Sequence, residues 1–188
     1  MKLISQVKPL PGITDNNHEI IVNNNDLYLL HENNQIPFGD WPEWIRVILL
    51  SELKNDMRAQ ISLDDMGIID EEQRLITFTY CNYGGYDNKP DFENGVLNRE
   101  YWNCGYRGTC KHEGQLCQLV KCKNGVLSPR ETEVLKLIEQ GYQNKEIAEM
   151  LNISEFTINN HRANISAKTG LQNRTELAHF AREKNIVK

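Results

Sequence analysis

The stretch of residues 127–178 reads LSPRETEVLKLIEQGYQNKEIAEMLNISEFTINNHRANISAKTGLQNRTELA and indicates the fold of the C-terminal part of the chain. Near its start, Ser128, Pro129 and Glu131 combine a capping hydroxyl, a proline in the first turn and a glutamate three residues after the cap. That combination is a capping box, which begins a helix. Apolar residues then recur at helical spacing until Gly141, and glycine commonly ends helices. The stretch therefore opens with an amphipathic helix.

The same stretch predicts three more helices, each begun by a capping side chain. Asn144 is expected to cap a second helix over 145–151, and Ser154 a third that runs to about residue 168. Asn173 is expected to cap the fourth. Two short helices with a tight connection, the second one freshly capped, are typical of a helix-turn-helix motif. A four-helix bundle without a role in DNA binding is the alternative interpretation.

The third of these helices has two different faces. At 100° per residue, Ile158, His161 and Ile165 fall on one side, which we expect to face the core. The opposite side carries no acidic residue and consists of Phe156, Asn159, Asn160, Ala163 and Ala167. Small and amide side chains suit entry into a major groove, where carboxylates would be repelled by phosphates.

Four motifs in order, LSPRETEVL, GYQNKEIAEMLNIS, T-I-x-x-H and KTG…NRTEL, make residues 127–178 similar to the LuxR-type DNA-binding domain. The resemblance covers roughly a third of the chain and needs no gaps. It implies an all-α four-helix domain that forms a homodimer on double-stranded DNA. It also implies a role in transcription regulation, often exerted through contact with RNA polymerase.

The resemblance further implies that the third helix, 154–168, is the recognition helix, with Asn159, Asn160 and Ala163 facing the bases. Many family members carry a basic residue at the first and last of these positions, and this chain does not. Asparagine can bond both polar groups of adenine, and Ala163 or Phe156 can touch a thymine methyl. We therefore expect a half-site that favours A·T pairs.

A second set of residues is expected to contact phosphates, which positions a protein on DNA without reading its sequence. For each, the alternative is a solvated surface charge or a helix cap. These candidate phosphate contacts are Lys145, Thr157, Arg162, Lys168 and Arg174.

Composition restricts the class of protein. The chain has 188 residues, 39% of them hydrophobic, which excludes collagen-like and fully disordered proteins. The 21 Lys and Arg against 26 Asp and Glu give a net charge of −5. An acidic total does not exclude DNA binding, because the basic footprint that matters is local. No apolar run approaches the roughly 18 residues of a membrane helix, and no signal-peptide core is present. We expect a cytoplasmic protein.

The first two thirds of the chain predict an α+β domain over 1–124, followed by the helical domain at 125–188. Residues 1–40 are rich in Asn and Asp between short apolar runs, which indicates short strands joined by turns. Asp40 is expected to cap a helix that runs to about Met57. Alternation of β-branched and aromatic residues over 75–80 predicts a further strand.

All five cysteines lie in the segment 81–122, which shows little periodicity. Clustered cysteines in a cytosolic chain indicate metal ligands or redox groups more than disulfides. The spacing Cys104-x5-Cys110-x6-Cys117-x4-Cys122 predicts a structural zinc knuckle that would hold this loop-rich segment together. Cys81 or His112 could replace one ligand. An iron–sulfur cluster and free thiols remain the alternatives.

The sequence thus predicts a DNA-binding transcriptional regulator whose N-terminal domain is a metal-binding or sensing module. No arrangement of nucleophile, base and orienting group indicates catalysis, so we expect no enzyme. The alternative from another class is a zinc- or thiol-dependent enzyme that the C-terminal domain tethers to DNA. A scaffold that recruits partners and binds DNA without sequence preference is a third interpretation.

Overall fold

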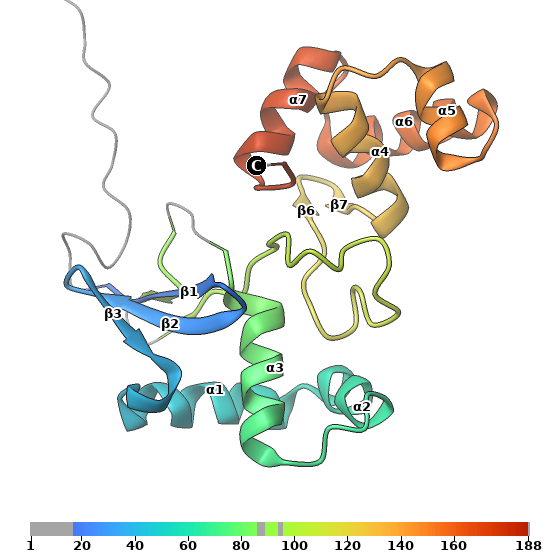
Figure 1. Ribbon diagram of the computed structural model, residues 1–188. Helices are drawn as coiled ribbons and strands as arrows, with labels where there is room; N and C mark the ends of the chain where they lie inside the picture. Colours follow the sequence, from blue (N-terminus) through green and yellow to red (C-terminus); the bar gives the residue numbers. More distant parts are fainter. Residues whose placement is uncertain (1–16, 86–88, 94–95, 188) are drawn as a thin grey trace, which may run out of the picture. The chain divides into compact units, whose positions relative to one another are not determined.

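The computed structural model describes residues 17–85, 89–93 and 96–187. The chain divides into two compact units, Met1–Glu100 and Tyr101–Lys188 (Figure 1). From the sequence, the boundary is predicted between residues 124 and 125, where a segment with little periodicity is followed by one with helical periodicity. The boundary in the structure lies earlier in the chain because residues before 124 pack with the C-terminal helices. Val120 is buried in the helical core, and its carbonyl accepts a hydrogen bond from the Leu127 amide at 2.9 Å. Within the described ranges, no helix is both long and apolar enough to cross a membrane.

The N-terminal unit begins with an antiparallel sheet in the order β1-β2-β3. Its strands are β1 (Glu19–Asn23), β2 (Asp26–His31) and β3 (Asn34–Pro37). Both connections are two-residue turns with positive φ, at Asn24–Asn25 and Glu32–Asn33. Such turns match the twist of hairpin strands, and asparagine tolerates their backbone. The predicted short strands are confirmed here, while residues 1–16 lie outside the described part of the chain.

Three helices follow the sheet: α1 (Glu43–Asn55), α2 (Met57–Asp65) and α3 (Glu71–Tyr83). Two predictions are corrected by them. Asp40 does not cap α1, because it ends a short 3₁₀ turn, η1 (Phe38–Asp40), and Pro42 occupies the cap position. The strand predicted over 75–80 lies inside α3.

The burial pattern explains why the third helix replaces that strand. The buried residues of α3 recur at steps of three and four, which is helical spacing: Leu75, Phe78, Thr79, Asn82 and Tyr83. Asp70 caps the helix by accepting a hydrogen bond from the Gln73 amide at 2.8 Å. The β-branched residues of the segment therefore follow its tertiary packing and not their strand propensity.

Two small hairpins complete the sheets. One pairs β4 (Phe92–Glu93) with β5 (Val96–Leu97), and the other pairs β6 (Lys121–Cys122) with β7 (Gly125–Val126). The β6–β7 hairpin lies in the C-terminal unit, directly before its helices.

The helices of the C-terminal unit are α4 (Pro129–Glu139), α5 (Asn144–Leu151), α6 (Glu155–Thr169) and α7 (Arg174–Glu183). The capping box at Ser128 and the caps at Ser154 and Asn173 are confirmed. The predicted cap at Asn144 is wrong by one position, because Gln143 forms the capping box of α5 with Glu146. The helices enclose one core that includes Leu135, Ile138, Ile147, Ile158, Ile165 and Leu177.

Candidate nucleic-acid interface

The helix-turn-helix consists of α5, a tight turn and α6. Asn152 takes the left-handed conformation at φ 51°, which ends α5 and turns the chain. Ser154 then accepts a hydrogen bond from the Thr157 amide at 3.1 Å and so begins α6. Ile158 and Ile165 are fully buried and fix the inner side of α6 in the core. The helix is therefore held by apolar packing on one side and exposed on the other.

The outer side of α6 is the face that the sequence predicted. Five residues are exposed on it, and none of them is acidic: Phe156, Asn159, Asn160, Ala163 and Ala167. Phe156 is 73% exposed, an unusual position for a large apolar side chain. His161 is half-buried, on the flank of the helix. The acidic residue of α6, Glu155, lies in its first turn, where the helix dipole favours negative charge.

A short hydrogen-bond network joins this face to the start of α5. The Asn144 side-chain amide donates to Asn159 Oδ1 at 2.7 Å, and Arg162 Nη1 donates to Asn144 Oδ1 at 2.9 Å. The network fixes the carboxamide of Asn159. A carboxamide oxygen has two lone pairs and its nitrogen has two hydrogens. Asn159 can therefore still accept one hydrogen bond through Oδ1 and donate through Nδ2 to a second partner. The side chain of Asn159 is thus held in one orientation on the exposed face of α6.

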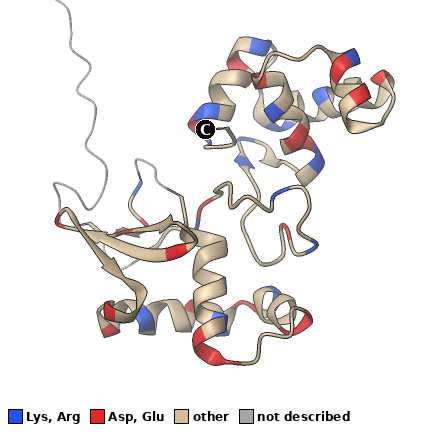
Figure 2. Ribbon diagram, in the orientation of Figure 1, with Lys and Arg blue, Asp and Glu red and all other residues tan. Residues whose placement is uncertain are grey.

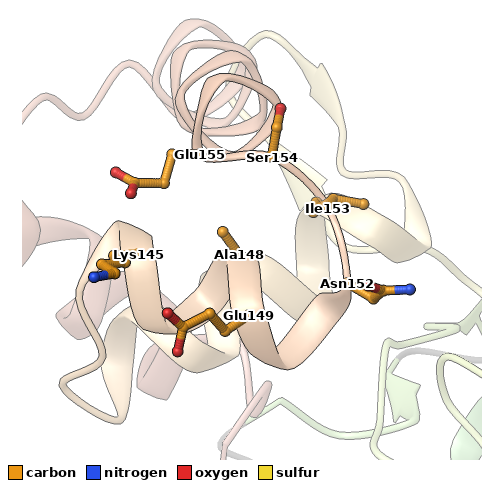
Figure 3. Close-up of a pocket in the computed structure, with 7 residues that line it drawn as sticks. All are labelled: Lys145, Ala148, Glu149, Asn152, Ile153, Ser154 and Glu155. Carbon is orange, nitrogen blue, oxygen red and sulfur yellow. The ribbon is translucent and has the colours of Figure 1, made fainter.

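Two of the five candidate phosphate contacts lie beside helix N-termini. Lys145 is exposed in the first turn of α5 and has no ion-pair partner within the described residues. Figure 3 shows it at one side of a surface groove of about 500 Å³, with Glu149 on the same helix and Glu155 at the start of α6. Thr157 is half-buried and its hydroxyl lies 2.8 Å from that of Ser154. Backbone amides at helix N-termini favour anions, so both positions suit a phosphate.

The other three candidates have partners inside the protein. Arg162 donates to Asn144, as described above. Lys168 Nζ lies 2.6 Å from Glu131 Oε2, and Arg174 Nη2 donates to the carbonyls of Ile138 and Tyr142 at 3.0 and 2.9 Å. Burial, together with the nearby positive charge of Arg174, lowers the pKa of Arg162. Each of these cations therefore stabilises the domain, and its contact with phosphate stays a prediction.

Glu131 links the start of α4 to the end of α6. It is 3% exposed and accepts hydrogen bonds from the Ser128 amide at 2.7 Å and from Lys168. Burial alone would raise the pKa of this carboxyl. The hydrogen bonds from Lys168 and Ser128 outweigh burial and lower the pKa below its usual range. The carboxylate is thus a charged, fully partnered group in the domain interior.

Among the described residues, the cysteines of the predicted zinc knuckle do not converge on one centre. Across residues 17–85, 89–93 and 96–187, no three His, Cys, Asp or Glu side chains come close enough together to hold a metal ion. Cys117 lies near Cys104 and Arg107, whereas Cys122 lies near Lys168 and Lys184. Cys81 belongs to α3 in the other unit.

Two of these thiols are also affected by burial. Burial raises the pKa of both Cys117 and Cys122, which favours the protonated thiol. A zinc or iron–sulfur site needs several thiolates around one centre. The set Cys104, Cys110, Cys117 and Cys122 does not fit such a centre here, and His112 does not complete one. Zinc and an iron–sulfur cluster stay predictions of the sequence.

An arginine holds the loop-rich segment in which the metal was expected. The Arg107 guanidinium donates to the carbonyls of Trp102 and Gln118, both at 3.0 Å. It also forms a buried ion pair with Glu113 at 3.6 Å and lies 4.3 Å from the centre of the Tyr101 ring. A single side chain thus joins both ends of the loop. No pattern in the sequence points to Arg107, because a lone arginine has no characteristic spacing.

Comparison with known proteins agrees with the motif. Residues 125–181 match the model of the bacterial regulatory proteins of the luxR family. A region of 62 residues is 45% identical to the oxygen regulatory protein NreC of Staphylococcus aureus strains JH9, JH1 and Mu3. It covers 33% of this chain and 29% of that relative, so less than a third of either protein is shared. No solved structure matches the chain significantly. Residues 125–181 are therefore a helix-turn-helix domain of the luxR family.

Proposed function

We propose that this chain is a transcriptional regulator that binds promoter DNA through the exposed face of α6. The observation that carries the proposal is the row of uncharged side chains on α6, which is backed by buried Ile158 and Ile165. A single α-helix fits the major groove of B-form DNA. The luxR-family match supports the same use of this helix.

The proposal gives a role to individual residues of this face and of the helix N-termini. Asn159 and Asn160 bond adenine, while Ala163 and Phe156 touch thymine methyl groups. Lys145 and Thr157 bind phosphates at the two helix N-termini. Arg162, Lys168 and Arg174 each keep further N–H donors beyond those used within the domain, so a phosphate contact is compatible with their internal bonds.

Charge supports assigning DNA binding to the C-terminal unit. Residues 101–188 contain 13 Lys and Arg against 9 Asp and Glu, whereas residues 1–100 contain 8 against 17. Figure 2 shows these charges along the ribbon. An acidic unit is repelled by phosphate, so we assign the N-terminal unit to regulation through interaction or sensing. The chain would then act in the cytoplasm, where promoter DNA is found.

The proposed complex is a homodimer on DNA. Helix-turn-helix domains commonly bind as two-fold pairs, so the target would be two half-sites of related sequence. Contact with RNA polymerase would follow the behaviour that the family resemblance implies. No side-chain arrangement in the described residues favours the alternative of a tethered enzyme.

Selection of binding sites from random duplex DNA by the full chain tests the proposal. We expect recovered half-sites that favour A·T pairs. Asn159→Ala should lose roughly 1–3 kcal/mol of discrimination at one base position, the usual worth of a bidentate contact. The matched control Asn55→Ala, an exposed asparagine of α1, should leave both affinity and selection unchanged. Recovered sequences dominated by G·C would overturn the base assignments, and binding without sequence preference would favour a scaffold.

A further inference from the structure

The β6–β7 hairpin lies directly before α4, and four of its six residues precede the region that matches the luxR family. Lys121 pairs with Val126 and Cys122 with Gly125, which leaves Lys123 and Asn124 as a two-residue turn. The segment 101–126 contains four basic residues and one acidic residue. The family resemblance assigns no role to this element.

The turn of the hairpin is attached to the C-terminal end of α6. The Asn124 amide donates to the Lys168 carbonyl at 2.9 Å, and its side chain donates to the Ala167 carbonyl at 3.0 Å. Carbonyls in the last turn of a helix have no hydrogen-bond donor within the helix. The two bonds from Asn124 therefore supply donors to the carbonyls of Ala167 and Lys168. A Cβ atom on Gly170 would lie 3.8 Å from Lys123 Cδ. The hairpin is therefore held in a defined position beside α6.

The side chains of the hairpin point in two directions. Residues alternate between the faces of a strand, and Cys122 packs against the helical core. Lys121 consequently projects from the opposite face of the strand, whereas Lys123 lies in the turn with its side chain beside Gly170, and both lysines are exposed. In the part of the chain that the structure describes, neither lysine has an ion-pair partner. Two unpaired ammonium groups thus stand at one end of the helix that we propose to enter DNA.

We propose that the β6–β7 hairpin is a second DNA-binding element, which contacts the phosphate backbone through Lys121 and Lys123 beside the groove that α6 enters. This inference rests on the proposed function of α6. The partner is duplex DNA, because the lysines are continuous with the end of the recognition helix and complement the charge of phosphate. Phosphate contacts add affinity without reading bases. The hairpin should thus strengthen binding and leave sequence preference unaltered.

Salt dependence of DNA binding tests this inference with the full chain and its selected site. Each phosphate contact contributes about 0.9 to the slope of log affinity against log salt concentration. The double variant Lys121→Ala/Lys123→Ala should therefore flatten the slope by about 1.8 per subunit. At 0.1 M salt its affinity per half-site should fall by roughly ten- to sixty-fold. The bases recovered in site selection should not change.

Three further variants separate a specific contact from a general effect of charge. Lys54→Ala/Arg58→Ala removes the same two charges from exposed positions of the acidic unit and should leave the slope unchanged. Lys121→Arg/Lys123→Arg keeps the charge and should keep the slope. Asn124→Ala releases the hairpin from α6 without changing its charge, and it should flatten the slope in part.

The outcomes distinguish the hairpin from the recognition helix. If the parent binds a selected sequence and Lys121→Ala/Lys123→Ala has the parental slope, the inference is wrong and the proposed function stands. An equal loss in the Lys54→Ala/Arg58→Ala control would also overturn it. If the parent binds no duplex at all, both proposals fail. Hydrogen exchange of α4 to α7 in each variant should match the parent, except at the end of α6 in Asn124→Ala.

Discussion

The carboxylate of Glu131 makes a quantitative prediction about the stability of the DNA-binding domain. Glu131→Gln keeps the shape of the side chain and removes its charge. The variant loses the charge-assisted hydrogen bond with Lys168, which is 2.6 Å long in the parent. Hydrogen bonds to charged groups contribute roughly 1.5–3 kcal/mol. Because the Lys168 side chain is 31% exposed and remains partly hydrated, we expect a loss near the lower end, about 2 kcal/mol.

Hydrogen exchange of the full chain, read in peptides of α4 and α6, measures this loss locally. A loss of about 2 kcal/mol should reduce the protection of those amides by roughly thirty-fold at pH 7. Local measurement is needed because a chain of two units need not unfold in one step. Glu133→Gln is the matched control, since its ion pair with Arg130 is also 2.6 Å long but its side chain is 39% exposed. That change should cost well under 1 kcal/mol.

The pH dependence of the difference in hydrogen-exchange protection between the parent and Glu131→Gln gives a second test. The pKa of Glu131 is lowered in the folded protein, so its charge stabilises the fold at any pH above the unfolded value of about 4.3. The contribution is lost as the pH falls through the lower, folded value. The parent and Glu131→Gln should therefore differ fully at pH 7 and converge in acid. Equal protection at pH 7, or a difference that persists unchanged in acid, would refute the assigned role of the charge.

Three further predictions concern the two structural arginines and the cysteine-rich loop. Arg107→Lys keeps the charge but cannot reach both carbonyls, so amides of the loop 101–120 should exchange about tenfold faster or more, by mass spectrometry. A metal chelator added to the native chain should leave that exchange unchanged, because the arginine holds the loop, and a chelator-induced loss of protection would restore the predicted zinc site. Arg174→Ala removes the hydrogen bonds to Ile138 and Tyr142 and should destabilise the end of α4 by about 1–3 kcal/mol, whereas no change in exchange there would contradict its capping role.

The helical domain could be predicted from its sequence because the interactions that begin its helices are local. Ser128 and Glu131 are three residues apart, and so are Ser154 and the amide it accepts from. A cap depends on its immediate neighbours, so a short window of sequence contains the whole interaction. The error at α5 is of the same local kind, since Gln143 and Asn144 are adjacent and both are polar.

The errors lie where the deciding contacts are distant in sequence. The segment 75–80 has strand propensity, yet packing against the rest of the N-terminal unit makes it helical. The metal site stays a prediction, because the number of cysteines and the absence of periodicity do not determine where the thiols lie in space. Arg107 reaches a carbonyl 11 residues away, and Lys168 pairs with a carboxylate 37 residues away. Such pairs are visible only once the chain is folded.

The cations around the recognition helix explain why a second phosphate-binding element would be useful to this domain. Arg162, Lys168 and Arg174 each use part of their donors on partners within the protein, and the outer face of α6 carries no charge. Many relatives would have basic residues on that face, according to the family resemblance. Uncharged side chains give base contacts but release no counterions, which supply much of the affinity for DNA. The two lysines of the β6–β7 hairpin would add about two phosphate contacts per subunit to those made by the helix-turn-helix. The salt slope would then be steeper by about 1.8 per subunit. In this protein, base reading and electrostatic attachment would thus be divided between α6 and the hairpin that caps its end.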